Sequence, residues 1–476
     1  MVFSSPVFLF LFLPAVYVIY RLLPGIRSRN VFLALASLVF YSFGQLEYLP
    51  LFLLSVIINW ASGLALLKLE KGRRAVLTAA VIANLGILAY FKYTDFAIFN
   101  FNQLFGSSVP LKNIVLPIGI SFFTFQGMSY VIDVYRDRSS GTESFLKILL
   151  YISFFPQLIA GPIVKYHDIS QQIDLRNESP AFAAAGIRRF ICGLGKKVII
   201  ANTAGMIADR VFDEFLPASQ VDVRIAWLGA VCYSLQIYFD FSGYSDMAIG
   251  IGRMFGFKIL ENFDHPYGSG SIREFWRKWH ISLSTWFREY LYVPLGGNRR
   301  GKLRTVINRM LVFLCTGIWH GANWTFIVWG VCHGILSDLE GAGVIPVEKM
   351  KKTAAGRVIN RIYTMLAVIL LFVIFRADSL ASGWKLICAM FTPFVSSSAG
   401  FELRMMLSPA SVFVLMIAVI LSGNIPGRVQ KACEGALTAN PQVFEAILSA
   451  LSIVLLALCA MSLAHGGFNP FIYFQF

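Results

Sequence analysis

About eleven long apolar segments, separated by short polar stretches, constrain the fold of this chain more than any other feature, because a bilayer-spanning helix needs ~20 mostly apolar residues. Only 14% of the residues are charged and 57% are hydrophobic, over a length of 476 residues. That balance is typical of integral membrane proteins and excludes a soluble globular protein. The sequence therefore predicts an all-α polytopic membrane protein, with a single integral membrane domain over residues 1–476.

Basic residues lie between the apolar segments, where they indicate the topology. The chain has 41 Lys and Arg against 26 Asp and Glu, and cytoplasmic loops of membrane proteins carry such an excess. A nucleic-acid-binding protein would instead have its excess of basic residues clustered on one solvent-exposed face. Clusters at 21–29 and 68–74 enclose two apolar segments, and further basic stretches follow at 136–138 and 349–361. This parity predicts that the N-terminus and the C-terminal tail are both extracytoplasmic.

Three stretches depart from a simple spanning pattern. Basic pairs at 188–189 and 196–197 flank a short apolar turn, which favours an interfacial element. Residues 271–309 interleave basic with aromatic side chains and contain a break at 294–297, as amphipathic helices at the cytoplasmic interface do. Residues 310–337 contain no Asp, Glu, Lys or Arg, yet lie between two basic stretches. If both flanks are cytoplasmic, this segment doubles back.

His320 is the strongest candidate for a reacting side chain. It lies eleven residues after Arg309, which at ~1.5 Å per helical residue places it roughly 16 Å along, near the middle of a ~30 Å hydrocarbon core. Ionisable groups at that depth usually line pathways or reaction centres, and imidazole is the commonest general base near neutral pH. Trp319 and Asn323, beside it in the sequence, are expected to line or support the site. The alternative is a histidine that only bridges packed helices.

A second candidate group lies on the amphipathic stretch. Helical spacing of three to four residues would bring Arg277, His280 and Ser284 onto one face. That face suits a phosphate-bearing ligand, because arginine offers a charge-assisted fork to anionic oxygens. Contact of the basic residues with lipid headgroups is the alternative. His333, thirteen positions after His320, lies well round a straight helix from it and joins the site only if the segment breaks.

Polar side chains also interrupt the apolar segment at 222–256. Asp240, Ser242 and Asp246 would cost several kcal/mol in hydrocarbon unless they face protein or water, so we expect them to point inward. A buried carboxylate either orients a catalytic imidazole or stabilises a helix bundle. No Gly-rich phosphate loop, HExxH motif, GxSxG elbow or zinc spacing occurs. Neither a metal site nor a soluble hydrolase or ATPase is therefore expected.

The chain resembles one family closely, the membrane-bound O-acyltransferases, and within it the alginate O-acetyltransferase-like branch. The similarity spans most of the chain, and its central motifs are long and idiosyncratic. The matching stretches are FFPQLIAGPIVKY (154–166), YFDFSGYSDMAIGIGRMFGF (238–257), NFDHPYGSGSIREFWRKWHISLSTWFREYLYVPLGGN (262–298), GIWHGANWTFIVWGVCHG (317–334) and FIYFQF (471–476).

The resemblance implies a core of about eleven tilted transmembrane helices, with re-entrant and interfacial helices around a central tunnel. The essential histidine of the family maps onto His320, and its other prominent motif histidine onto His280. His320 would act as a general base or carry the acyl group transiently; both remain open. The residues expected to bind the acyl donor are Trp276, Arg277, Lys278, Ser284 and Arg288.

The resemblance also implies substrates and partners. The donor would be acetyl-CoA or a similar thioester, with no permanently bound cofactor. The membrane would be the bacterial cytoplasmic membrane, and an SGNH-type extracytoplasmic partner would complete acetylation of a polysaccharide, with residues 471–476 near its docking site.

Three alternatives remain at this point. One is D-alanyl transfer toward teichoic acids, which would use a carrier-protein thioester. A proton-coupled transporter would also contain buried histidines and the carboxylates Asp240 and Asp246. A scaffold that recruits a polymer synthase through its tail is the third.

Overall fold

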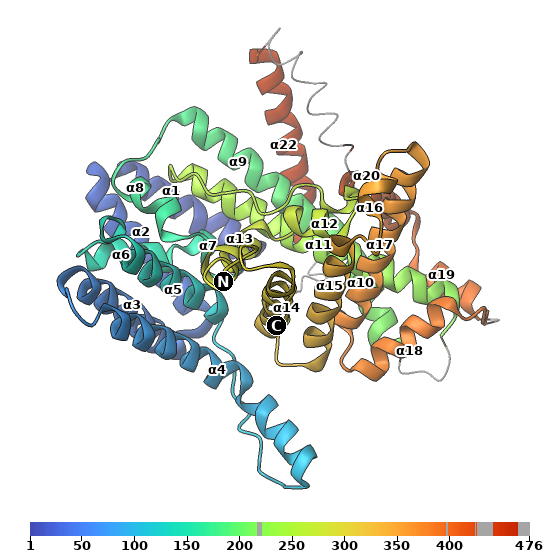
Figure 1. Ribbon diagram of the computed structural model, residues 1–476. Coiled ribbons are helices and arrows are strands. Elements are labelled where there is room, and N and C mark those ends of the chain that lie inside the picture. Colours follow the sequence, from blue (N-terminus) through green and yellow to red (C-terminus); the bar gives the residue numbers. More distant parts are fainter. Residues whose placement is uncertain (217–220, 397, 424, 426–440, 465–476) are drawn as a thin grey trace. The chain divides into compact units, whose positions relative to one another are not determined.

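The computed structural model describes residues 1–216, 221–396, 398–423, 425 and 441–464 (Figure 1). All regular elements in these residues are helices, which confirms the all-α prediction. Two compact units are present: unit 1 contains residues 1–190 and 244–261, and unit 2 contains residues 191–243 and 262–476. The expected single membrane domain stays a prediction. The expected docking segment, residues 471–476, lies outside the described residues.

Unit 1 is built around helices that begin in the first two hundred residues. Helices α3, α4 and α5 pack against one another (Figure 1). Asn59 of α3 and Asn84 of α4 exchange amide hydrogen bonds of 3.1 and 3.0 Å, which satisfies both side chains in an apolar setting. The elements are η1 (Phe8–Phe12), α1 (Leu13–Leu22), α2 (Gly25–Gln45), η2 (Leu46–Tyr48), α3 (Leu49–Lys68), α4 (Arg73–Phe105), α5 (Ile120–Arg136), η3 (Arg138–Ser140), α6 (Phe145–Ser153), α7 (Phe155–Leu158), α8 (Tyr166–Asp174) and α9 (Pro180–Gly195), the last continuing into unit 2.

Unit 2 contains the segments that carry the candidate site. Residues 223–243 of α11 belong to it, and the remainder of that helix belongs to unit 1. The elements are η4 (Lys196–Ala201), α10 (Asn202–Asp209), η5 (Arg210–Phe215), α11 (Val223–Met254), η6 (Pro266–Gly268), α12 (Ile272–Lys278), α13 (Ile281–Phe287), η7 (Arg288–Tyr292), α14 (Lys302–His320), α15 (Trp324–Ala342), α16 (Val347–Met350), α17 (Ala354–Arg376), α18 (Leu380–Phe391), α19 (Ala399–Met406), α20 (Pro409–Ser422) and α22 (Pro441–Ala464).

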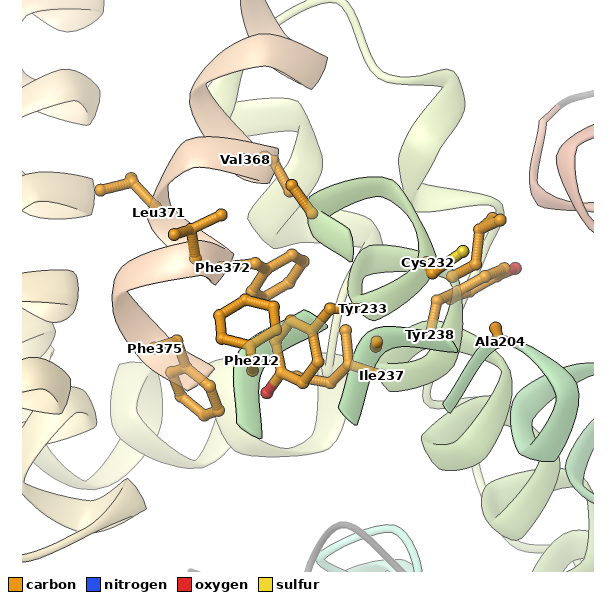
Figure 2. Close-up of a cluster of buried hydrophobic side chains, with 14 of the residues drawn as sticks. Ala204, Phe212, Cys232, Tyr233, Ile237, Tyr238, Val368, Leu371, Phe372 and Phe375 are labelled. Carbon is orange, nitrogen blue, oxygen red and sulfur yellow. The ribbon is translucent and has the colours of Figure 1, made fainter. Parts of the chain in front are cut away.

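The core of unit 2 is largely aromatic. Figure 2 shows Phe372 of α17 beside Phe212 and Tyr233, with Phe375 one turn further along the same helix. The rings of Tyr233 and Phe372 lie 6.4 Å apart, centroid to centroid. Phe375 is 3% exposed, and its ring also contacts the candidate site. The apolar core thus forms one wall of that site.

The uncharged segment at 310–337 doubles back, as the sequence predicted. Helix α14 ends at His320, and α15 begins at Trp324 and packs along α14. Glycines at the contact allow the close approach: a Cβ on Gly317 would lie 2.5 Å from the carbonyl oxygen of Phe326, and one on Gly330 2.5 Å from that of Phe313. Larger side chains at these positions would push the two helices apart.

Five helices are long and apolar enough to cross a membrane, or six if the bent pair α19 and α20 forms one span, counted over the described residues only. The expected count of about eleven is therefore not confirmed. One of the five covers Pro180–Phe215, where the sequence favoured a short interfacial turn. The expected turn is wrong, because the helical path is continuous there and Lys197 is 3% exposed, paired with a carboxylate inside unit 2. The interfacial position of this stretch stays a prediction.

Candidate active site

His320 lies at the turn between α14 and α15. The backbone of Gly321 is extended, and Asn323 then starts α15 by accepting a hydrogen bond of 3.1 Å from the backbone N–H of Thr325. The amide of Asn323 also donates to the carbonyl of Asp378 at 3.0 Å. Asn323 therefore has a direct structural role, in capping the helix and anchoring the turn beside His320. The His320 side chain is nearly enclosed, with 4% of the residue exposed.

Three histidines and two tryptophans alternate in a row that we call the His–Trp row: His280, Trp319, His320, Trp329 and His333. Neighbouring ring centroids are 5.9, 5.1, 5.1 and 5.0 Å apart along it. All four contacts are edge-to-face, with interplanar angles from 69° to 88°, as aromatic quadrupoles favour. The helix breaks after His320, and this break brings His333 back to the site. From the sequence, such a break was the condition for His333 to join the site.

His280 connects α12 to α13 in a left-handed conformation, with φ of 45°. Its Nδ1 lies 3.3 Å from Oδ1 of Asn262, and its ring lies 4.5 Å from that of Phe241. The residue is fully buried. Burial lowers the pKa of His280, which lies outside the helices able to span a membrane, to about 3. The imidazole is therefore neutral near pH 7.

The expected common face of Arg277, His280 and Ser284 does not exist. The helix stops at Lys278 and restarts at Ile281, so the spacing rule for one continuous helix does not apply. Arg277 is exposed while His280 is buried. Ser284 is half-buried and its hydroxyl donates to the backbone carbonyl of Trp276 at 3.3 Å.

Apart from Ser284, the expected donor-binding residues separate into two groups. Arg277 and Arg288 are exposed, and half-buried Lys278 forms an ion pair of 3.0 Å with Glu274. Trp276 lies instead in the aromatic interior, with its ring 5.3 Å from that of His333. Only the first group is placed to meet a solvated phosphate, and its role stays a proposal.

The acidic candidates are buried, as expected, and each pairs with a basic side chain of its own unit. Asp240 lies 2.8 Å from the ammonium group of Lys197 in unit 2. Asp246 accepts a hydrogen bond of 2.8 Å from Nε of Arg189 in unit 1. Ser242 is 2% exposed. These pairings favour the interpretation that both carboxylates stabilise the helix bundle.

Two supporting residues were missed by the sequence reasoning. Asn262, fully buried, accepts hydrogen bonds from the backbone N–H and the hydroxyl of Ser282 at 3.1 and 2.9 Å, and so ties the loop before η6 to the turn at His280. Glu340 of α15 accepts from the backbone N–H groups of Ile272 and Arg273 at 2.7 and 3.1 Å, and thereby caps α12. Two acidic residues, Asp338 and Glu340, directly follow the uncharged segment, and this position is the one sequence feature that pointed to Glu340.

No cluster of three His, Cys, Asp or Glu side chains suited to a metal ion occurs in the described parts of the chain. The chemistry that the row itself offers is that of imidazole, which in its neutral form both donates and accepts one hydrogen bond, in surroundings that contain few competing dipoles. Such a group is suited to moving a proton between two bound substrates.

Comparison with known proteins identifies matching sequences over the same region. A family model for MBOAT, the membrane-bound O-acyltransferase family, matches residues 45–374. A probable alginate O-acetylase of Azotobacter vinelandii is 38% identical over all of both chains. A peptidoglycan O-acetyltransferase of Helicobacter pylori is 39% identical over 82% of this chain and 80% of its own. A teichoic acid D-alanyltransferase of Bacillus subtilis is 30% identical over 55% of this chain and 67% of its own.

Proposed function

Because the chain belongs to the membrane-bound O-acyltransferase family, and is an enzyme of the membrane, we propose that it moves an acetyl group across the bacterial cytoplasmic membrane for O-acetylation of an extracytoplasmic polysaccharide. Acetyl-CoA or an equivalent cytoplasmic thioester is the donor. An SGNH-type partner outside the membrane completes the transfer. The observation that carries the choice of acetyl is the full-length match to an alginate O-acetylase.

The D-alanyl alternative has weaker support. The relative named as a D-alanyltransferase matches little more than half of this chain, whereas the two relatives named as O-acetylating enzymes match four fifths or all of it. The transporter alternative loses its main support, because Asp240 and Asp246 are each held by a basic side chain.

We assign the transfer step to His320. Its imidazole takes the proton of the acceptor hydroxyl, or accepts the acetyl group itself, while the thioester C–S bond breaks and the sulfur receives a proton. Enclosure at 4% exposure keeps bulk water, a competing acceptor, away from the thioester. Arg277 and Arg288, both exposed, bind the phosphates of the donor.

The donor is tested with inside-out membrane vesicles that contain the chain, its extracytoplasmic partner and the polysaccharide. One sample receives acetyl-labelled acetyl-CoA and the other receives a carrier protein loaded with labelled D-alanine. We expect acetyl label in the polysaccharide and no transfer of D-alanine. Label that enters only from the D-alanyl carrier would overturn the assignment. Vesicles with His320→Ala provide the blank, because they contain the same membrane and partner.

A further inference from the structure

Among the described residues of unit 2, three neighbouring side chains have buried polar nitrogens that are left without a partner. His333 is fully buried, and neither of its ring nitrogens has a hydrogen-bond partner among the described residues. The same holds for Nε1 of Trp276 and Nε1 of Trp329, whose residues are 9% and 1% exposed. Buried polar atoms without partners are rare and costly in folded proteins, and each requires an explanation.

These three side chains contact one another. The ring centroids are 5.0 Å apart for Trp329 and His333, 5.3 Å for Trp276 and His333, and 5.6 Å for Trp276 and Trp329. They form a closed group, which we call the indole–imidazole triad. Phe275 and Phe313 stack parallel to the imidazole at 6.2 and 6.4 Å and contribute no hydrogen-bonding side-chain atoms.

The triad consists mostly of donors. Each indole offers one N–H and accepts nothing, and a neutral imidazole offers one N–H and one acceptor. The group that satisfies it is therefore rich in acceptors, such as a carbonyl oxygen. Neutral donors also suit this interior, because a lysine or arginine in an aromatic pocket would need its own counter-charge.

The position of the triad connects it to the acyl-transfer step. Trp329 contacts His333 on one side and His320 on the other, with centroid distances of 5.0 and 5.1 Å. In acyl transfer the carbonyl oxygen of the thioester gains negative charge when the new bond forms at its carbon. N–H donors held in place beforehand stabilise that charge.

We propose that the indole N–H groups of Trp276 and Trp329, together with His333, bind the carbonyl oxygen of the acyl thioester and stabilise the oxyanion formed from it. This rests on the proposed function. The acceptor oxygen bonds to the thioester carbon, and one electron pair of the carbonyl moves onto the carbonyl oxygen. On collapse the C–S bond breaks, and the proton of the acceptor hydroxyl passes through His320 to the thiolate.

The test uses the full chain in membrane vesicles with its partner, polysaccharide and acetyl-CoA as the varied substrate. Trp276→Phe and Trp329→Phe each remove one N–H and keep an aromatic ring. We expect kcat to fall about 100-fold in each variant, with KM for acetyl-CoA within about 3-fold of the parent. Trp279→Phe is the matched control: this ring, 3% exposed, stacks on Tyr267 and Phe275 in the same core. It should retain kcat.

Two further changes separate hydrogen bonding from packing. Benzothienylalanine at position 329 replaces the indole N–H by sulfur while it preserves the ring shape, so it should lower kcat as far as Trp329→Phe does. His333→Gln keeps a donor and an acceptor and should retain at least 10 times the kcat of His333→Leu. These comparisons decide the matter even if one phenylalanine variant fails to fold.

The proposal is overturned if both phenylalanine variants, or the sulfur analogue, keep kcat within about 3-fold of the parent. Equal activity of His333→Gln and His333→Leu would also overturn it. A lower melting temperature with unchanged kcat would assign the triad a packing role only. If His320→Ala is fully active in the same assay, the proposed function itself fails; if only the triad variants are active, the proposed function stands and this inference alone is wrong.

Discussion

Three histidines in one row have different surroundings, and the differences bear on what each side chain does. His280 has Asn262 at 3.3 Å from Nδ1, a contact that fixes the orientation of its ring. His320 ends a helix at a turn, between the rings of Trp319, Trp329 and Phe375.

At His280 we predict a structural effect rather than a shift in pH dependence. His280→Ala removes the bond to Asn262 and the ring contact with Phe241, leaving a cavity that costs about 3 kcal/mol. His280→Asn should lose less, because asparagine tolerates the left-handed conformation and keeps polar atoms. Thermal unfolding in detergent measures both.

The pH profile of the His280→Asn enzyme provides the second readout. With its pKa lowered to about 3 by burial, His280 stays neutral across the range from about pH 5.5 to 8.5 and loses no proton within it. Residual activity should therefore follow the pH profile of the parent enzyme. If the rise or fall of the variant's activity with pH were shifted within that range relative to the parent, His280 would titrate during catalysis.

The exposed arginines provide a prediction about donor binding. Arg277→Ala combined with Arg288→Ala should raise KM for acetyl-CoA about 10-fold or more, since each charge-assisted hydrogen bond contributes roughly 1.5–3 kcal/mol, and should leave kcat unchanged. Steady-state kinetics against acetyl-CoA measure this. Arg357→Ala, also exposed in unit 2, is the control. An unchanged KM would instead favour the alternative that both arginines contact lipid headgroups.

At the scale of elements, the sequence predicted where the chain reverses better than where its helices stop. The hairpin of α14 and α15 followed from an uncharged stretch between two basic ones. The stop between α12 and α13 did not, because it depends on the left-handed His280 and on hydrogen bonds that Asn262, which is distant in sequence, accepts from Ser282. The helix over Pro180–Phe215 was also missed, since the partner that neutralises Lys197 lies on another helix.

The close packing of the hairpin predicts intolerance to side-chain volume. Gly330→Val should destabilise the protein by about 3 kcal/mol or more, because the atom that a new Cβ meets at 2.5 Å is a backbone oxygen that has little freedom to move. Gly86→Val is the matched control, in helix α4 with no atom within 4 Å of the corresponding Cβ. Equal melting temperatures for the two variants would contradict the packing described here.

At the scale of the whole molecule, composition and charge predicted a polytopic membrane protein, and family membership confirms its class. The number of spans was less predictable from apolar segments, because several fold as short or bent helices: residues 146–164 divide into α6, α7 and a non-helical stretch. Hydropathy detects apolar character, whereas bends arise from local capping and tertiary contacts.

The expected orientation of the chain leads to a prediction for labelling. In a variant whose seven cysteines are replaced by serine, single cysteines at Glu47, Lys71 and Lys352 would report on three exposed positions. A membrane-impermeant maleimide should label Glu47→Cys on intact cells and the other two only after permeabilisation. Labelling of Lys71→Cys on intact cells would reverse the orientation proposed for the N-terminal helices.

The most direct measurement is the acetyl content of the exported polysaccharide in cells that produce His320→Ala or His320→Gln. Both variants should reach the membrane in normal amounts and lower acetylation by about 100-fold or more, since a positioned acid–base group contributes roughly 10²–10⁴ in rate. His265→Asn, a half-buried histidine in another loop of unit 2, should leave it unchanged. Acetylation within 2-fold of the parent in His320→Ala cells would contradict the role of His320 as the transfer residue.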